Sequence, residues 1–327
     1  MGRTYAVIDV GSNTIHLLVG EVVEGSVVPV TDEKVSVRLG AGVEETGRIE
    51  EERLRIATGT IDLFARISAM HGVERPEVIA TSAVRDAENG RDLIGAVRVL
   101  TGLDVRLLSG EEEATVGFRG AMSATRAVSE ESLANGFGPP VVVVDLGGGS
   151  AQLILGDMGG PEREVSLPLG SNRMTERFVA SDPPSPTELD RVREYVLSQL
   201  PDWELPEDIH SVAIGGSARA MVRVLGHSLD RANARPGSEG QESEGTFTRE
   251  SLRAVAAEVG EFPSAVYSRE RGLGPLRSRV LPAAAATLEA MLEGLGLESF
   301  TVARAGLREG AILTLALNGT LDETVNT

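Results

Sequence analysis

IDVGSNT, at residues 8–14, is the stretch that decides the fold of this chain, because its form returns as VDLGGGS at residues 144–150. In each copy, apolar residues run into an aspartate, then into small residues, and then into a second apolar run. That pattern is typical of a β-hairpin whose tip brings backbone N–H groups and a carboxylate to one point. The two copies therefore predict a duplicated phosphate-binding clamp.

The composition excludes several classes of protein. A chain of 327 residues exceeds the usual size of one hydrophobic core, so two lobes are expected. The formal net charge of −18 argues against nucleic-acid and membrane-surface binding. The absence of cysteine excludes disulfides, thiolate metal sites and a cysteine nucleophile. Because no apolar run is long enough to span a bilayer and no signal peptide is recognisable, we expect a cytoplasmic protein.

The few lysines and histidines narrow the chemistry further. Lys34 is the only lysine and does not lie in a Walker A loop, which excludes a P-loop NTPase. None of the histidines stands in an Arg-His-Gly motif, and neither Asp9 nor Asp145 has a second aspartate two positions on. Histidine phosphatases and aspartyl-phosphate phosphatases therefore lose their support.

The order of predicted elements is the same after each glycine-rich stretch. Three strands, the third running over 27–39 with a break at 31–33, precede alternating helices and strands, and a similar series starts again at residue 141. The Ser-, Ala- and Gly-rich segment 123–140 is the predicted boundary, and 227–246 reads as an excursion. The pattern predicts an α/β fold with two lobes, residues 1–125 with 304–327, and residues 126–303.

The two tips are the candidate phosphate-binding loops. In the first, Gly11 permits close approach of an oxygen, the side chains of Ser12, Asn13 and Thr14 can donate to it, and Asp9 can hold a divalent cation or a water. An ordinary hairpin with an Asx-turn would also explain this tip taken alone. The second tip adds three adjacent glycines, a costly choice that indicates a ligand or another backbone at contact distance. Its candidate residues are Gly147, Gly148, Gly149 and Ser150.

Two helix starts are further candidates. Gly215, Gly216 and Ser217 follow a predicted strand and open a helix, where they form either an anion-friendly edge or a simple N-cap. Glu111, Glu112 and Glu113 open another helix, where acidic residues suit the helix dipole in any case. Since successive helical residues point about 100° apart, only one of the three carboxylates can face a site and act as a general base.

Arginines supply nearly all of the positive charge. Arg85 follows a buried strand, where its guanidinium can bind a phosphate in bidentate fashion or pair with Asp86 or Glu88. The arginines at 269, 271, 277 and 279 form a possible path for a polyanion or a solvated loop. His16 alternates with apolar residues, which indicates a satisfied core imidazole rather than a catalyst.

Taken in order, these motifs resemble the exopolyphosphatase and guanosine pentaphosphate phosphohydrolase (Ppx/GppA) family. The resemblance runs from about residue 6 to about residue 312. It is carried by VIDVGSNTIH (7–16), ATSAVRDA (80–87), SGEEEA (109–114), VDLGGGS (144–150), SLPLG (166–170) and LREG (307–310).

The resemblance implies the duplicated, actin-like (ribonuclease H-like) ATPase fold, with two lobes and a cleft between them. It implies Mg²⁺-dependent hydrolysis of a terminal phosphoanhydride, with Glu113 as general base, Arg85 as a further catalytic residue, and Asp145 holding metal or water beside Asp9. The expected substrate is inorganic polyphosphate, with guanosine pentaphosphate as the alternative, and a homodimer is expected by resemblance only.

One departure from the family pattern bears on activity. The family usually has Ser-Thr-Glu after the three glycines, whereas this chain has Ser150, Ala151 and Gln152, which replaces a carboxylate by a neutral amide. Gln152 can hydrogen-bond a water but adds no charge to a cation site. A polyphosphate or nucleotide sensor with low turnover is therefore a further hypothesis.

Overall fold

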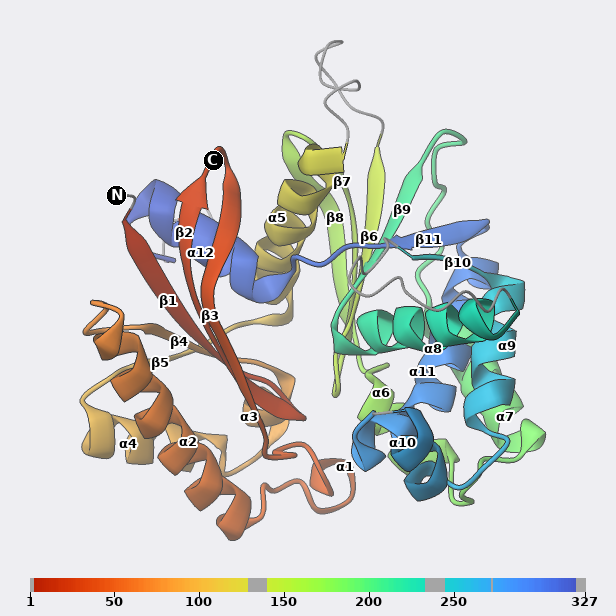
Figure 1. The fold of residues 1–327 in the computed structure, drawn as a ribbon, viewed down its shortest axis with the longest axis horizontal. Coiled ribbons are helices and arrows are strands. Elements are labelled where there is room, and N and C mark those ends of the chain that lie inside the picture. The colour runs from red at the N-terminus through yellow and green to blue at the C-terminus, as the bar shows by residue number, and fades with distance from the viewer. Residues whose placement is uncertain (1–2, 129–139, 233–244, 272, 322–327) are drawn as a thin grey trace. The chain divides into compact units, whose positions relative to one another are not determined.

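The computed structural model describes residues 3–128, 140–232, 245–271 and 273–321, and Figure 1 shows their fold. Contacts between residues divide the chain into a first unit, formed by 1–138, 152–166 and 305–327, and a second unit, formed by 139–151 and 167–304. The lobe limits expected from the sequence stay a prediction. Parts of the expected boundary segment 123–140 and of the excursion 227–246 lie outside the described residues.

The first sheet has five strands in the order β3-β2-β1-β4-β5. β1 (Thr4–Val10), β2 (Thr14–Val23) and β3 (Ser26–Ser36) form an antiparallel meander, and β4 (Glu77–Ala80) and β5 (Val105–Leu107) continue it in parallel. β3 is continuous, so the break expected at 31–33 is wrong. Thr31, Asp32 and Glu33 each pair with a residue of β2. The irregularity of this strand pair is a β-bulge, which lies next to these residues, between Val19 and Gly20 of β2.

The second sheet has the order β10-β11-β9-β6-β7-β8. Its strands are β6 (Val141–Leu146), β7 (Ala151–Asp157), β8 (Gly160–Leu167), β9 (His210–Ile214), β10 (Thr246–Thr248) and β11 (Ser299–Val302). Read from β8, this sheet repeats the first: third strand, second, first, fourth, fifth, with β10 added at the edge. The repeated order confirms the predicted α/β fold built from a duplicated unit.

The helices follow the apolar periodicity of the sequence. They are α1 (Val43–Thr46), α2 (Glu51–Met70), α3 (Ser82–Asp86), α4 (Gly90–Thr101), α5 (Gly110–Val128), α6 (Ser171–Phe178), α7 (Pro186–Gln199), α8 (Gly216–Ala232), α9 (Arg249–Val259), α10 (Ser264–Arg271), α11 (Pro275–Gly294) and α12 (Leu307–Asn318). Within the described ranges, none of them combines the length and the apolar character that a membrane crossing requires.

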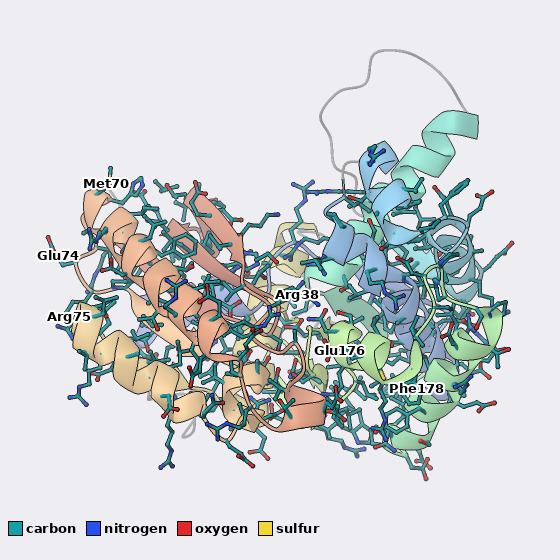
Figure 2. The ribbon with its side chains drawn as sticks, turned by 90° about the horizontal axis from the view of Figure 1, so that it is seen from below. Arg38, Met70, Glu74, Arg75, Glu176 and Phe178 are labelled. Atoms are coloured by element: carbon teal, nitrogen blue, oxygen red, sulfur yellow. The ribbon has the colours of Figure 1, made fainter. Side chains whose placement is uncertain are left out.

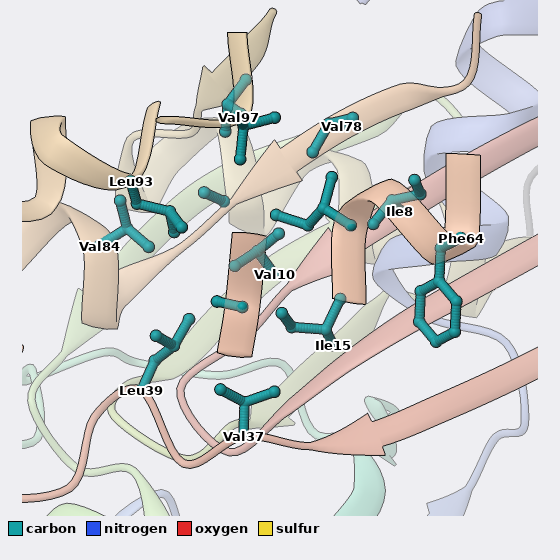
Figure 3. Packing of buried hydrophobic residues seen from close by; sticks show 14 of the residues in the cluster. Ile8, Val10, Ile15, Val37, Leu39, Phe64, Val78, Val84, Leu93 and Val97 are labelled. Atoms are coloured by element: carbon teal, nitrogen blue, oxygen red, sulfur yellow. The ribbon is translucent and has the colours of Figure 1, made fainter. Parts of the chain in front are cut away.

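The core of the first unit lies on both faces of its sheet. On one face, Ile8, Val10 and Ile15 from β1 and β2 pack against apolar residues of α2 and α4, among them Phe64 and Leu93, as Figure 3 shows. On the other face, α12 packs against α5 and β1. The helices α5 and α12 can cross closely because Gly120 and Gly310 have no Cβ. A Cβ at either position would overlap the facing backbone. The C-terminal helix is thereby fixed to the sheet that carries the first tip.

Candidate functional site

The first tip, residues 11–14, is a tight turn between β1 and β2. Its carbonyls accept hydrogen bonds from the loop that follows β3. The amide of Gly11 donates to the carbonyl of Thr14 over 3.1 Å. The amide of Gly40 donates to the carbonyl of Ser12 over 2.8 Å, and the amide of Arg38 donates to that of Asn13 over 2.9 Å. A Cβ on Gly11 would meet the carbonyl of Thr14 at 3.2 Å, which explains the glycine.

The side chains of this tip point to different partners. The hydroxyl of Ser12 is buried and lies 2.9 Å from that of Ser82 at the start of α3. Ser12 therefore joins the tip to the motif that carries Arg85, three residues further along α3. Asn13 and Thr14 are only partly buried, so their side chains are the more accessible candidates for contact with a ligand.

Thr14, His16 and Arg308 form a chain of hydrogen bonds behind the tip. The Oγ1 atom of Thr14 lies 2.8 Å from Nε2 of His16, and Nδ1 of the same imidazole lies 3.3 Å from Nη1 of Arg308. A guanidinium can only donate, so Nδ1 is the acceptor and the imidazole hydrogen is on Nε2. Thr14 therefore accepts from His16, and among the described residues its own hydroxyl hydrogen has no acceptor. The hydroxyl of Thr14 can therefore donate to a ligand.

Arg308, at the start of α12, supplies a buried positive charge to this group. Its Nη1 donates to Oδ1 of Asp32 on β3 over 2.7 Å, and its Nη2 lies 3.7 Å from Glu309. Burial alone would lower the pKa of the Arg308 guanidinium, but the charges of Glu309, Asp32 and Asp9 outweigh it and hold the pKa above its usual value. The electrostatic coupling to Asp9 places this cation beside the carboxylate that precedes the first tip.

Glu113 is the carboxylate of its helix that faces inward. Glu111 is exposed and Glu112 half-buried, whereas the side chain of Glu113 is only 8% exposed. Its Oε2 atom lies 3.2 Å from Nη1 of Arg85, which also donates to the carbonyl of Leu108 over 2.8 Å. The sequence-based expectation that only one of the three carboxylates can be directed at a site agrees with this geometry.

Arg85 pairs with Glu113 and not with Glu88, which the sequence analysis considered as a partner. Glu88 bonds Arg48, and Asp86 lies 3.8 Å from Nε of Arg85. In the described part of the chain, no acceptor is paired with Nη2 of Arg85. That nitrogen is left for an oxygen of a ligand, while Nη1 holds Glu113 in place.

Glu112 closes the N-terminus of α5. It accepts from the amide of Ser109 over 2.8 Å and from Arg106 over 2.7 Å. Partial burial would raise the pKa of Glu112, but the bonds from Ser109 and Arg106 outweigh it and lower the pKa below its usual value. The neighbour of Glu113 is therefore a structural cap.

The second tip, residues 147–150, is held by backbone. Its Gly147 amide donates to the carbonyl of Ser150 over 3.0 Å. The first amides of α6 donate into the tip, from Ser171 to Gly147 and from Asn172 to Gly148, both over 2.9 Å. A Cβ on Gly170 would overlap the backbone of Gly148 and Gly149. One of the two causes that the sequence offered for this glycine run, another backbone at contact distance, is present in the structure, and the other, a ligand, stays a prediction.

The third glycine stretch, residues 215–217, packs beside the second tip, and both belong to the second unit. Gly215 has φ 103° and brings its backbone against Leu146 and Asp145, where a Cβ would meet the Asp145 carboxylate at 3.0 Å. The hydroxyl of Ser217 accepts from Nη1 of Arg277 over 3.0 Å and lies 3.3 Å from that of Ser171.

Burial, together with the charge of Arg219, lowers the pKa of the Arg277 guanidinium. Asp145, two glycine turns, two hydroxyls and an arginine are thus gathered at one edge.

The described arginines of the run at 269–279 have different surroundings. Arg277 reaches Ser217, whereas Arg279 donates to the carbonyls of Ser181 and Val179. Arg269 is exposed, and the side chain of Arg271 lies outside the described residues. Sequence reasoning missed the roles of Ser171, His16 and Arg308. The LREG motif, which carried part of the family resemblance, was the available signal for Arg308.

Gln152 occupies the position where the family pattern has a carboxylate. It is 1% exposed, and its Nε2 donates to the hydroxyl of Ser166 on β8 over 3.1 Å. Counting from the tip glycines, Gln152 in the second copy corresponds to His16 in the first. Each copy thus has a hydrogen-bonding side chain other than a carboxylate at this point.

Asp9 and Asp145 are the carboxylates that the sequence predicts as magnesium ligands. Both are partly buried carboxylates two positions before a tip glycine, and hard oxygen donors suit Mg²⁺. In the ranges that the structure describes, no group of three or more His, Asp or Glu side chains is arranged to hold a metal. Mg²⁺ usually takes one or two carboxylates, waters and substrate phosphates, so single aspartates fit a site that substrate completes.

Comparisons with known proteins agree with the motifs. A profile of the Ppx/GppA phosphatase family matches residues 18–319. Exopolyphosphatase 1 of Mycobacterium tuberculosis is 31% identical over 313 residues, covering 94% of this chain and 86% of that protein. Exopolyphosphatase 2 of the same organism is 36% identical over 210 residues, covering 60% of this chain and 61% of that protein.

Two solved structures resemble the chain over almost its whole length. A Ppx/GppA family member from Aquifex aeolicus has a TM-score of 0.74 at 26% identity, covering 97% of this chain and 98% of that one. An exopolyphosphatase from Cytophaga hutchinsonii has a TM-score of 0.82 at 24% identity, covering 97% and 99%. The second likeness shows the fold alone.

Proposed function

The chain belongs to the Ppx/GppA phosphatase family, and on that premise we propose that it is an exopolyphosphatase, which releases orthophosphate from the end of inorganic polyphosphate. The observation that carries the proposal is the Arg85–Glu113 pair: a buried carboxylate, held at 3.2 Å by a guanidinium that keeps one nitrogen for a ligand. The relatives named exopolyphosphatase support the choice of substrate.

In the proposed mechanism a water attacks the terminal phosphorus and the bond from that phosphorus to the bridging oxygen breaks. The proton of the water passes to the carboxylate of Glu113, and orthophosphate and a shortened chain leave. Arg85 and the hydroxyl of Thr14 donate to phosphate oxygens, because positioning and charge stabilisation carry most of the catalysis in phosphoryl transfer. Mg²⁺, which the carboxylates of Asp9 and of Asp145 are each suited to bind, would supply further charge neutralisation.

The test is phosphate release from polyphosphate with Mg²⁺ by the wild type, Glu113→Gln and the matched control Glu112→Gln. A general base contributes roughly 10²–10⁴-fold, so Glu113→Gln should lower kcat by that factor with little change in KM. Glu112→Gln, one position away, should keep the wild-type kcat because Glu112 caps the helix. Release by Glu113→Gln at the wild-type rate would overturn the assignment of the base.

Two other functions remain to be separated by experiment. The activity of a guanosine pentaphosphate hydrolase would depend on the nucleobase of its substrate and not on polyphosphate chain length. The activity of the proposed enzyme should depend on chain length and not on a nucleobase. The buried Gln152 favours the second alternative, a sensor that binds polyphosphate with low turnover. Tight binding of polyphosphate without phosphate release would support the sensor. A cytoplasmic location and a homodimer are parts of the same proposal, and fractionation and sedimentation would test them.

A further inference from the structure

Arg38 has a backbone conformation that an arginine rarely adopts. Its φ is 59°, in the left-handed region, and among the described residues other than glycine only Glu24, with φ 50°, shares a positive value. Such a conformation is strained for a residue with a Cβ, and strain of this kind is concentrated at functional sites. Glycines take positive φ nearby, at Gly42 and Gly47, so a glycine at 38 would have met the demands of the backbone.

The place of Arg38 in the first unit is at the first tip. It lies two residues after β3, and its amide donates to the carbonyl of Asn13 over 2.9 Å. Figure 2 labels Arg38 close to where the N-terminal strands end. The strained residue is therefore fixed directly to the loop that we propose for phosphate binding.

The side chain of Arg38 has no partner among the residues that the structure describes. Within the described residues it makes no hydrogen bond or ion pair, although it is partly buried and acidic residues outnumber basic ones by 49 to 31. The other arginines near the tip, Arg85 and Arg308, each have a carboxylate partner. A guanidinium without a carboxylate partner, on a residue whose backbone is bonded to the tip, can bind an anion of the substrate.

We propose that Arg38 is a phosphate-binding residue of the first tip, and that its guanidinium pairs with a phosphate group of the polyphosphate chain. The inference rests on the proposed function, because it takes polyphosphate as the ligand. The strain at residue 38 is retained because only a side chain supplies the charge. Since Arg38 binds the substrate before and during reaction alike, its loss raises KM rather than lowering kcat.

The test compares Arg38→Gly, Arg38→Gln and Arg38→Lys with the matched control Glu24→Gly. Arg38→Gly and Arg38→Gln should both raise KM for polyphosphate about tenfold, as expected for a charged hydrogen bond, and Arg38→Lys should recover part of the loss. Both glycine variants relieve strain, so their melting temperatures should not fall below that of the wild type. Glu24→Gly, in the turn between β2 and β3, should keep the wild-type KM.

The contrary outcomes are distinct from a failure of the proposed function. An unchanged KM in Arg38→Gly and Arg38→Gln, with active wild type, overturns the role of Arg38 alone. If the wild type releases no phosphate, calorimetry with polyphosphate of one defined length replaces KM. In that case, weaker binding by both charge-free variants supports the inference although the enzyme proposal has failed. Equal binding by wild type and variants, or no binding at all, overturns the inference.

Discussion

The first tip, at 11–14, and the second, at 147–150, close with the same hydrogen bond, from the first residue's amide to the last residue's carbonyl, over 3.1 and 3.0 Å. In both, amides from the segment after the third strand donate to the tip carbonyls. The two tips differ in what surrounds this shared backbone. Ser12 and Thr14 bond side chains of other elements, whereas glycines at 148 and 149 accept the backbone of Gly170 at contact distance.

This difference shows how a duplicated motif can divide its work. The first copy has the partly buried hydroxyl of Thr14, the guanidinium of Arg308 linked to it through His16, and the backbone of Arg38 bonded to Asn13, which suits recognition of an anion. In the second copy, Gly148 and Gly149 lie against the backbone of Gly170, so we interpret this copy as built mainly for close backbone packing. Four sets of variants test this division, in order of decreasing effect.

The largest effect is expected from Gly170→Ala in the second copy. Its Cβ would overlap the backbone of Gly148 and Gly149, which cannot move aside, so we expect a loss of about 3 kcal/mol in the free energy of unfolding. The matched change in the first copy, Gly40→Ala, places a Cβ 3.1 Å from that of Ser12 and should cost less than about 1 kcal/mol. Urea unfolding followed by circular dichroism measures both, and equal losses would contradict the division.

Thr14→Val removes the hydroxyl of Thr14 from the first copy. A hydrogen bond to a charged oxygen contributes about 1.5–3 kcal/mol, so kcat/KM for polyphosphate should fall at least about tenfold. Thr14→Ser keeps the hydroxyl in reach of His16 and should recover most of the activity. If the valine variant is as active as the serine variant, the chain Thr14–His16–Arg308 does not serve substrate binding.

Gln152→Glu restores the carboxylate of the family pattern in a buried place. Burial should raise the pKa of the introduced carboxyl group above its unfolded value, so the variant loses stability relative to the wild type as pH rises above about 4.3. We expect a deficit of about 1–3 kcal/mol at pH 7, and a smaller one when Mg²⁺ is added. Thermal melts from pH 4 to 8 with and without Mg²⁺ measure it. A deficit that ignores Mg²⁺ would argue against a metal at this position.

Glu112→Gln should give the smallest effect, about 1 kcal/mol, because it weakens one helix cap. The pKa of Glu112 is lowered in the folded state, so its contribution to stability is present above the unfolded pKa and is lost as pH falls. Wild type and variant should therefore differ at pH 7 and converge below about pH 4. A difference that persists in acid would show that the cap acts through shape and not through charge.

The fold was readable from the sequence because its signals are local. Apolar runs that end in Asp and Gly predicted both hairpins, and the same series after each predicted the duplication that the sheet orders confirm. Helical geometry also predicted that a single carboxylate among 111–113 would face inward, and Glu113 does. The surroundings of the charge run at 269–279 were not readable, because spacing along the chain says nothing about which arginine is buried.

The supporting contacts of the site were not readable, because they join positions far apart in the chain. No residue near His16 in the sequence predicts that its ring is bonded by an arginine 292 positions later. His16 was expected as a satisfied core imidazole, and both ring nitrogens are indeed bonded, but the side chain is only partly buried and lies behind a tip. The strain at Arg38 and the close approach of Gly170 depend on backbone angles that residue types alone do not specify.

The bond from Arg308 to Asp32 has a consequence for synthesis on the ribosome. β1, β2 and β3 emerge early, but the cation that orients His16 and offsets Asp9 belongs to a helix made after the whole second unit. Since domains fold as they emerge, the nascent meander spends most of translation without the bond from Arg308 to Asp32. Completion of the first tip is thereby coupled to arrival of α12, so a ribosome-bound fragment that lacks this helix would carry the phosphate loop without the charge that tunes it.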